Sequence, residues 1–286
     1  MMKSILAALD GSPESLAGLQ QAVVWAERLD AELRTVVVQD ERRFVSFPTY
    51  SDAEGTVPRP IPLAGADLKQ AEAEAAQEEA ELRATYEAAT KGRNVRGALI
   101  VVRGAVERTL IREAHAADLV VLGKRGRAHD EHVAEAGPTT ETLIHEALRP
   151  VLVVPKGAAT SGPVLVPFDG SKGVQRVMVS AVQMAAAAKA AFVVLTLASS
   201  KADGEEIQAP LRRYVKSHGV KAEFRVVAGK DSEREASRVI LGAAAELNPG
   251  LIAMGAFSQS PLKEWLLGSV TRDVLTKARC PVLMMT

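Results

Sequence analysis

The chain has 286 residues, enough for two domains of ordinary size that each bury a core of their own. Its 35 basic and 35 acidic residues balance, which argues against nonspecific binding to nucleic acid or to an anionic membrane surface. Cys280 has no partner for an intrachain disulfide, and the apolar run after Met1 is too short for a signal peptide or a membrane span, so we expect a cytoplasmic protein.

Short β-branched runs alternate with alanine-rich amphipathic stretches along the chain, a pattern typical of βαβ units around a parallel sheet. In the first half it predicts strands at 3–9, 33–39, 96–102, 118–122 and 150–154, and helices at 13–29, 65–91, 105–116 and 138–148. In the second half it predicts strands at 163–168, 191–197, 222–227, 250–254 and 281–285, and helices at 172–188, 204–218, 231–247 and 262–278. Both halves therefore have the same succession of elements.

The same motif also opens both halves. An apolar run that ends in Asp10-Gly11-Ser12 returns before Asp169-Gly170-Ser171, and each half closes on a proline followed by an apolar strand. A repeat of this length indicates two successive domains of one fold. We predict domains at 1–156 and 162–286. Their last strands are apolar edges that need cover, and in a tandem protein they can cover each other.

An insert near residues 41–66 has no counterpart of that length in the second half. It is rich in proline, serine, glycine and charge. Long loops inside a compact domain are commonly lids or binding loops. Two interpretations stay open for this insert, one as a segment that contacts a partner and one as a packed, functionally silent loop.

The strand ends suggest where a ligand would bind. In open parallel sheets, ligands bind beyond the carboxyl ends of the strands at the point where the strand order reverses. If the order is 3-2-1-4-5, Asp10 faces the loop that contains Gly123, and Asp169 faces the loop that begins at Gly255. In the second half this loop leads to Gly268 at a helix start, where free N–H groups and the helix dipole favour phosphate oxygens.

These residues resemble the universal stress protein family, whose members carry an aspartate near the end of strand 1 and a Gly-x2-Gly-x9-Gly-Ser/Thr phosphate loop before the last helix. The most similar stretch is 266–271 followed by 280–283. The resemblance implies an α/β fold with two tandem doubly wound domains, each a five-stranded parallel sheet of order 3-2-1-4-5 flanked by helices. It also implies dimers or tandem pseudo-dimers joined along strand 5, and a role in stress survival.

The resemblance further implies that ATP, ADP or AMP is the ligand, with any Mg²⁺ held mainly by the phosphates. In the second domain the matching nucleotide-binding positions are Asp169, Leu197, Gly255, Ser258, Gly268, Ser269 and Val270. In the first domain they are Asp10, Val38, Gly123, Gly126, Gly137 and Thr139. No metal site built from protein residues alone is expected.

The two predicted sites are unequal. Ser258 stands where the family has glycine, while in the first domain the loop is one residue longer and Pro138 removes an N–H donor. We therefore expect the second site to be closer to the pattern. Three basic residues of the first loop either place positive charge beside a phosphate or form a solvated cluster: Lys124, Arg125 and Arg127.

Three hypotheses about function follow. The leading one is a stress-response regulatory protein that binds ATP or a related adenine nucleotide in at least one domain. The alternative is a stress protein that binds no nucleotide and acts by protein–protein interaction, with the insert contacting a regulatory partner. A dedicated enzyme is the third, and it is disfavoured because the chain lacks both a Gly-x4-Gly-Lys-Ser/Thr loop and a Gly-x-Ser-x-Gly elbow, so a slow ATPase is the most that we expect. A homodimer stays open.

Overall fold

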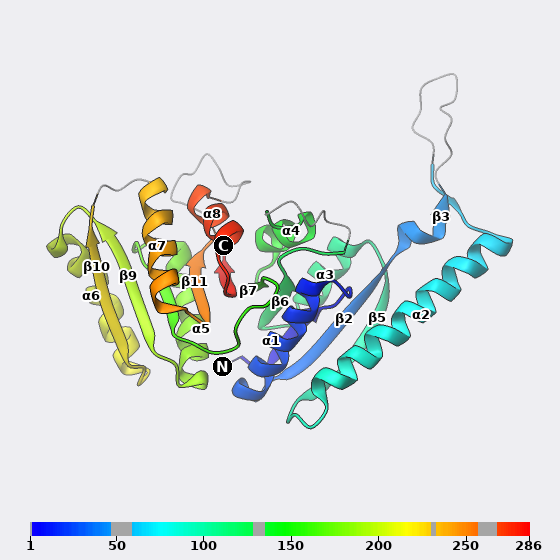
Figure 1. Cartoon of the computed structure of the whole chain (residues 1–286), viewed down its shortest axis with the longest axis horizontal. Helices are drawn as coiled ribbons and strands as arrows, with labels where there is room; N and C mark the ends of the chain where they lie inside the picture. The colour runs from blue at the N-terminus through cyan, green and yellow to red at the C-terminus, as the bar shows by residue number, and fades with distance from the viewer. Residues whose placement is uncertain (1, 47–58, 128–134, 230–232, 257–267) are drawn as a thin grey trace, which may run out of the picture.

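The computed structural model of the chain describes residues 2–46, 59–127, 135–229, 233–256 and 268–286. The described residues form a ten-stranded sheet with helices on both faces and a separate two-stranded sheet (Figure 1). None of the helices in these ranges is long and apolar enough to cross a bilayer.

The first half supplies the larger set of elements. Its strands in the main sheet are β1 (Ser4–Ala8), β2 (Glu32–Asp40), β5 (Arg96–Gly104), β6 (Leu119–Gly123) and β7 (Val151–Val154). Its α-helices are α1 (Pro13–Leu29), α2 (Gly65–Thr90), α3 (Val106–Ala114) and α4 (Pro138–Glu146). The insert adds the 3₁₀ helix η1 (Glu41–Phe44) and the short strands β3 (Val45–Ser46) and β4 (Ile61–Pro62), which pair antiparallel.

The second half repeats the main elements without the insert. Its strands are β8 (Val164–Pro167), β9 (Phe192–Ala198), β10 (Ala222–Ala228), β11 (Leu251–Gly255) and β12 (Val282–Met285). Its helices are α5 (Lys172–Ala188), α6 (Lys201–Ser217), α7 (Glu233–Leu247) and α8 (Ser269–Lys277).

The strand order confirms the predicted fold. Along the sheet the strands run β10-β9-β8-β11-β12-β7-β6-β1-β2-β5, so each half has the order 3-2-1-4-5. Within each half, all strand pairs of this ten-stranded sheet are parallel, as expected for βαβ connections. β7 and β12 pair antiparallel with each other, so the two last strands cover each other as predicted. The result is one continuous sheet in which the apolar edges of both halves are buried.

The first helix of each half is bounded alike, which explains why the motif repeats. The hydroxyls of Ser12 and Ser171 cap α1 and α5 by accepting a hydrogen bond from a backbone amide of the first turn. Both helices end at a residue in the left-handed region, Asp30 with φ 50° and Lys189 with φ 49°. These start and stop signals set equal lengths for two helices that occupy equivalent places on the sheet.

Two hydrophobic clusters lie on opposite faces of the sheet, and each runs through both halves. Ile5 and Ala7 of β1 belong to the cluster beneath α1, α2, α5 and α6, while Leu6 belongs to the cluster beneath α3, α4, α7 and α8. This alternation follows from the two-residue period of a strand. Cys280 lies in the second cluster, where burial raises the pKa of its thiol to about 11 and keeps it neutral.

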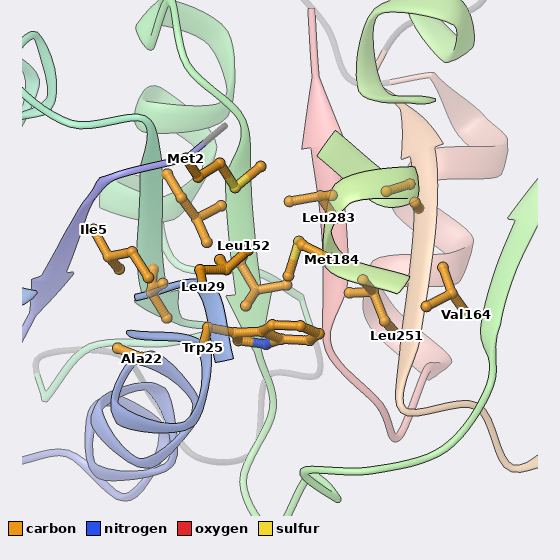
Figure 2. Packing of buried hydrophobic residues seen from close by; sticks show 14 of the residues in the cluster. Met2, Ile5, Ala22, Trp25, Leu29, Leu152, Val164, Met184, Leu251 and Leu283 are labelled. Atoms are coloured by element: carbon orange, nitrogen blue, oxygen red, sulfur yellow. The ribbon is translucent and has the colours of Figure 1, made fainter. Parts of the chain in front are cut away.

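Side chains from both halves meet where β7 lies beside β12. Leu152 and Leu283 are register partners there and are both fully buried. Figure 2 shows Trp25 of α1 and Met184 of α5 in the same region between the halves. The amide of Met2 donates to Oε1 of Gln183 at 3.2 Å, which adds a polar link across the junction.

Two element boundaries differ from the prediction by three residues or more. The last helix begins at Ser269 and not at 262, because Gly268 has an extended backbone with ψ 147° and forms its N-cap; residues 262–267 lie outside the described part. α6 begins at Lys201, three residues earlier than predicted, because Ser200 caps it by accepting from the amide of Asp203 at 3.2 Å. The sequence prediction missed Ser200 as an N-cap, because this serine precedes the first residues of the apolar helical pattern.

Candidate functional site

Each half has a pocket at the carboxyl ends of its first and fourth strands. The first pocket has a volume of 490 Å³ and includes Asp10, Val38 and Gly126 in its wall. The second pocket has a volume of 500 Å³ and includes Asp169, Leu197 and Gly268. Both lie where the strand order reverses, the location at which open α/β sheets bind ligands. Their similar volumes fall in the range of small-molecule sites, about 300–1,000 Å³.

The Asp-Gly-Ser turns shape the inner end of both pockets. In the first turn, Oδ1 of Asp10 accepts from the amide of Ser12 at 2.9 Å, and Gly11 has φ 81°. In the second, Oδ1 of Asp169 accepts from the amide of Ser171 at 2.9 Å, and Gly170 has φ 76°. A positive φ between the aspartate and the serine explains why glycine stands at the middle position in both copies.

Asp10 also connects the two strand ends that border the first pocket. Its Oδ2 accepts from the backbone amide of Arg127 at 2.8 Å, so β1 is tied to the loop after β6. Burial alone would raise the pKa of this carboxyl, but the hydrogen bonds from Ser12, Arg127 and Ser15 outweigh burial and hold it below its usual value of 3.8. The carboxylate is therefore ionised at neutral pH and retains lone pairs for a ligand hydroxyl.

Asp10→Asn is expected to destabilise the protein by about 1–2 kcal/mol at neutral pH, because the amide keeps only one acceptor for two backbone donors. A lowered folded-state pKa contributes stability above the unfolded pKa, and this stability is lost as pH falls through the folded value. The difference in the free energy of unfolding between wild type and variant should therefore shrink below pH 3.8. Urea unfolding at a series of pH values measures it, and a gap independent of pH would contradict the assignment to the carboxylate.

The glycines after β6 and β11 pack against a helix. A Cβ on Gly123 would lie 2.6 Å from the amide nitrogen of Ser15 in α1, and a Cβ on Gly255 would lie 3.0 Å from that of Val174 in α5. Gly126 is different, because a Cβ there would lie 2.9 Å from Oδ2 of Asp10 inside the pocket. Gly123 and Gly255, which the family resemblance assigns to the nucleotide, therefore also allow a helix to pack closely.

The helices that follow these loops start alike. Gly137 and Gly268 are the N-caps of α4 and α8, and neither helix start receives a side-chain capping bond. Buried threonines one turn in, Thr140 and Thr271, donate to the carbonyls of Gly123 and Gly255 at 3.0 and 3.2 Å. These hydroxyls fasten the helix starts to the strand ends, and both threonines also belong to the pocket walls.

Most of the residues predicted from the sequence line the pockets. In the first pocket these are Asp10, Val38, Gly123, Gly126 and Thr139. In the second they are Asp169, Leu197, Gly255, Gly268 and Val270. Gly137 and Ser269 lie at the helix starts but outside the pocket walls, and Ser258 lies outside the described residues. The hydroxyls of Thr139 and Ser269 donate to carboxylates, those of Glu107 and Glu233 respectively.

The basic residues of the first loop have three different positions. Nζ of Lys124, which is almost fully buried, donates at 2.7 Å to the carbonyl of Thr276 in the last turn of α8, across the junction of the two halves. Arg125 pairs with the buried Glu14 at 2.5 Å, and Arg127 pairs with Glu78 of α2. Neither interpretation offered for this cluster fits Lys124, which fastens one half to the other.

Several charged residues of the pockets were missed by sequence reasoning. In the first pocket they are Arg42 and Arg43 from η1, Asp40 at the end of β2, Glu78 from α2 and Glu107 from α3; in the second it is Glu233 from α7. Their sequence positions carry no motif, and only the fold brings them to the strand ends. Among the described residues, the lining of the second pocket has Asp169 and Glu233 as its charged members, whereas the first has arginines as well.

The distribution of polar and apolar groups suits a nucleotide. Val36, Val38 and Leu110 give the first pocket an apolar wall, as Leu195, Leu197 and Ile240 do in the second. The polar groups gather at the Asp-Gly-Ser turn and at the uncapped helix start. A planar base can pack on the apolar wall while hydroxyls and phosphates meet the polar end. The residues present therefore fit a nucleoside phosphate in both pockets.

Comparison with known families gives a match over both halves. A family model described as the universal stress protein family matches residues 1–155 and again 161–286. A universal stress protein from Synechocystis is 27% identical over 168 residues, which cover 58% of this chain and 57% of that protein. The chain thus spans little more than half the length of this relative.

Solved structures support the fold over nearly the whole chain. A universal stress protein from Archaeoglobus fulgidus is similar with a TM-score of 0.72 and 16% identity, covering 99% of this chain and 98% of that one. A functionally unknown protein from Pseudomonas aeruginosa PAO1 is similar with a TM-score of 0.60 and 17% identity, covering 99% of this chain and 92% of that one. At such identities the similarity establishes the tandem arrangement of the fold and nothing about ligands.

Proposed function

Because the chain belongs to the universal stress protein family, we propose that it is a stress-response regulatory protein that binds ATP or a related adenine nucleotide in at least one of its two pockets. One observation carries this proposal. Each pocket joins an apolar wall, an ionisable Asp-Gly-Ser turn and a helix start with no side-chain cap at a reversal of strand order. The proposed role is regulatory, with slow ATP turnover at most.

Different residues of each pocket would bind different parts of the nucleotide. The adenine would pack on the apolar wall beside Val38 or Leu197, and the carboxylate of Asp10 or Asp169 would accept from the ribose hydroxyls. In the second pocket the free amides at Ser269 and Val270 would donate to phosphate oxygens. A bound Mg²⁺ would supply positive charge to the phosphates.

Gly268→Asp is expected to abolish binding in the second pocket while the protein stays folded. Gly268 has φ −55° and ψ 147°, which aspartate adopts without strain, and aspartate is a favoured N-cap. Its carboxylate would accept from the amides that we assign to the phosphates and would repel them, a loss of about 100-fold or more in affinity. Calorimetric titration of ligand-stripped protein with ATP and Mg²⁺ measures both affinity and stoichiometry.

Gly268→Ala is the matched control, because it adds a methyl group without charge at the same position. Relative to wild type, the aspartate variant should lose one binding site and the alanine variant none. Wild-type protein that gives no heat with ATP, ADP or AMP, and no thermal stabilisation by any of them, would contradict the proposal. That result would favour the alternative in which the protein acts by contacting a protein partner.

A further inference from the structure

The insert brings charged side chains to the rim of the first pocket. Phe44 of η1 is buried, and the guanidinium of Arg103 from β5 lies 3.7 Å from the centre of its ring. Asp40 caps η1 by accepting from the amide of Arg42 at 2.9 Å and also pairs with the Arg42 guanidinium. These contacts anchor η1 at the end of β2, so Arg43 is held in the pocket wall by a fixed piece of backbone.

One carboxylate joins two of the arginines. Oε2 of Glu78 in α2 accepts from Arg43, and its Oε1 accepts from Arg127 in the loop after β6. All three side chains line the first pocket. Two guanidinium groups that converge on one anion form the arrangement by which proteins bind phosphate, since each offers a planar fork of donors. Glu78 thus occupies the place of an anionic ligand.

The position of Arg127 supports this interpretation. Its backbone amide donates to Asp10 at 2.8 Å, and its guanidinium lies over Gly11, where a Cβ would come within 2.4 Å of Nη2. The side chain therefore extends from the inner end of the pocket, over Gly11, to Glu78 of α2. In the second half no insert follows β9, and the described lining of the second pocket contains no arginine or lysine.

We propose that the first pocket selects nucleotides with two or three phosphates, that Arg43 and Arg127 bind these phosphates, and that Glu78 competes with the ligand for both arginines. This inference rests on the proposed function. A polyphosphate offers more charge and more acceptor oxygens than one carboxylate, so it displaces Glu78 when it binds. Displacement releases α2 from η1 and from the loop after β6, and occupancy of the pocket is thereby linked to the insert.

The test compares ATP, ADP, AMP and adenosine by calorimetry in the Gly268→Asp background, which confines binding to the first pocket. Glu78→Gln should tighten ATP about tenfold, because a neutral amide competes weakly for guanidinium groups, and should leave adenosine unchanged. Arg43→Gln should weaken ATP by about tenfold and again leave adenosine unchanged. The matched control is Glu81→Gln, whose exposed carboxylate on the same helix accepts from Gln77 at 3.1 Å, and no ligand should respond to it.

The inference is overturned if Glu78→Gln leaves the affinity for ATP at the wild-type value, or if it shifts adenosine as much as ATP. In that case binding persists and the proposed function stands. Failure of the proposed function is a different result, in which neither adenosine nor any of its phosphates binds even to the protein with Gly268 intact, and it overturns both. Tripolyphosphate tests the phosphate contacts without the nucleoside. If Arg43 and Arg127 bind the phosphates of ATP, tripolyphosphate alone should compete with ATP for the first pocket.

Discussion

Leu152→Asp is expected to destabilise the protein by more than about 4 kcal/mol, enough to part the two halves or unfold one of them. Leu152 is fully buried in the centre of the ten-stranded sheet, where its register partner across the junction is Leu283. The substitution removes a large apolar side chain and places a carboxylate inside the hydrophobic cluster that runs through both halves. Urea unfolding measures the loss, and scattering in solution measures separation of the halves.

Two further variants make this test sharper. Leu152→Ala should fold and lose about 2–5 kcal/mol, and a double-mutant cycle with Leu283→Ala should give a coupling energy near 1 kcal/mol if the contact is made across the junction. Val179→Asp on α5 is the control for adding a carboxylate, because that valine is 46% exposed, and it should change stability by less than about 0.5 kcal/mol. Additive alanine substitutions would contradict the pairing of β7 with β12.

The fold was readable from the sequence because its signals are local. β6 and β11 are apolar on both faces, as strands between two helix layers must be, and Ser12 and Ser171 mark the helix starts with their own hydroxyls. The pairing of the two halves followed from the same physics, since an apolar strand at an edge needs a neighbour. The 3₁₀ helix η1 carries no such signal, and it was not predicted.

The pocket was readable only in part. Asp10 and Asp169 follow closely after the strands that position them. Their place in the sequence was therefore enough to predict their place in the pocket. Arg43 and Glu78 meet across 35 residues, and α2 alternates alanine with glutamate so evenly that its sequence does not show which carboxylate faces the sheet. Contacts of this kind depend on where a long helix crosses its neighbours, which periodicity does not specify.

The sequence predicts glycines at the strand ends but does not show what each glycine packs against. The family resemblance assigns both Gly123 and Gly126 to the nucleotide, and the wall of the first pocket includes both. Gly123 also packs against α1, because the helix and the strand cross where both carry glycine, with a Cβ on Gly18 coming 3.3 Å from the amide nitrogen of Gly123. A small residue at a strand end can thus serve helix packing and ligand binding at once. Only the position of the neighbouring backbone shows which of these roles the residue has.

Gly123→Val is therefore expected to cost about 3 kcal/mol of stability, the upper end for overpacking, because the contact at 2.6 Å is with helix backbone that no rotamer change can relieve. Gly123→Ala should lose less and still fold, and Gly255→Ala should lose least, since its Cβ would lie 3.0 Å from the nearest atom. Urea unfolding of the three variants gives this order.

The control is Gly242→Ala in α7, where a Cβ would meet nothing within 4 Å. That variant should gain about 0.5–1 kcal/mol, because alanine is the better helix former. If Gly123→Ala were as stable as wild type, the close packing of α1 on β6 would be wrong. In that case the glycine would have to be explained by the ligand, and loss of ATP binding without loss of stability would be its signature.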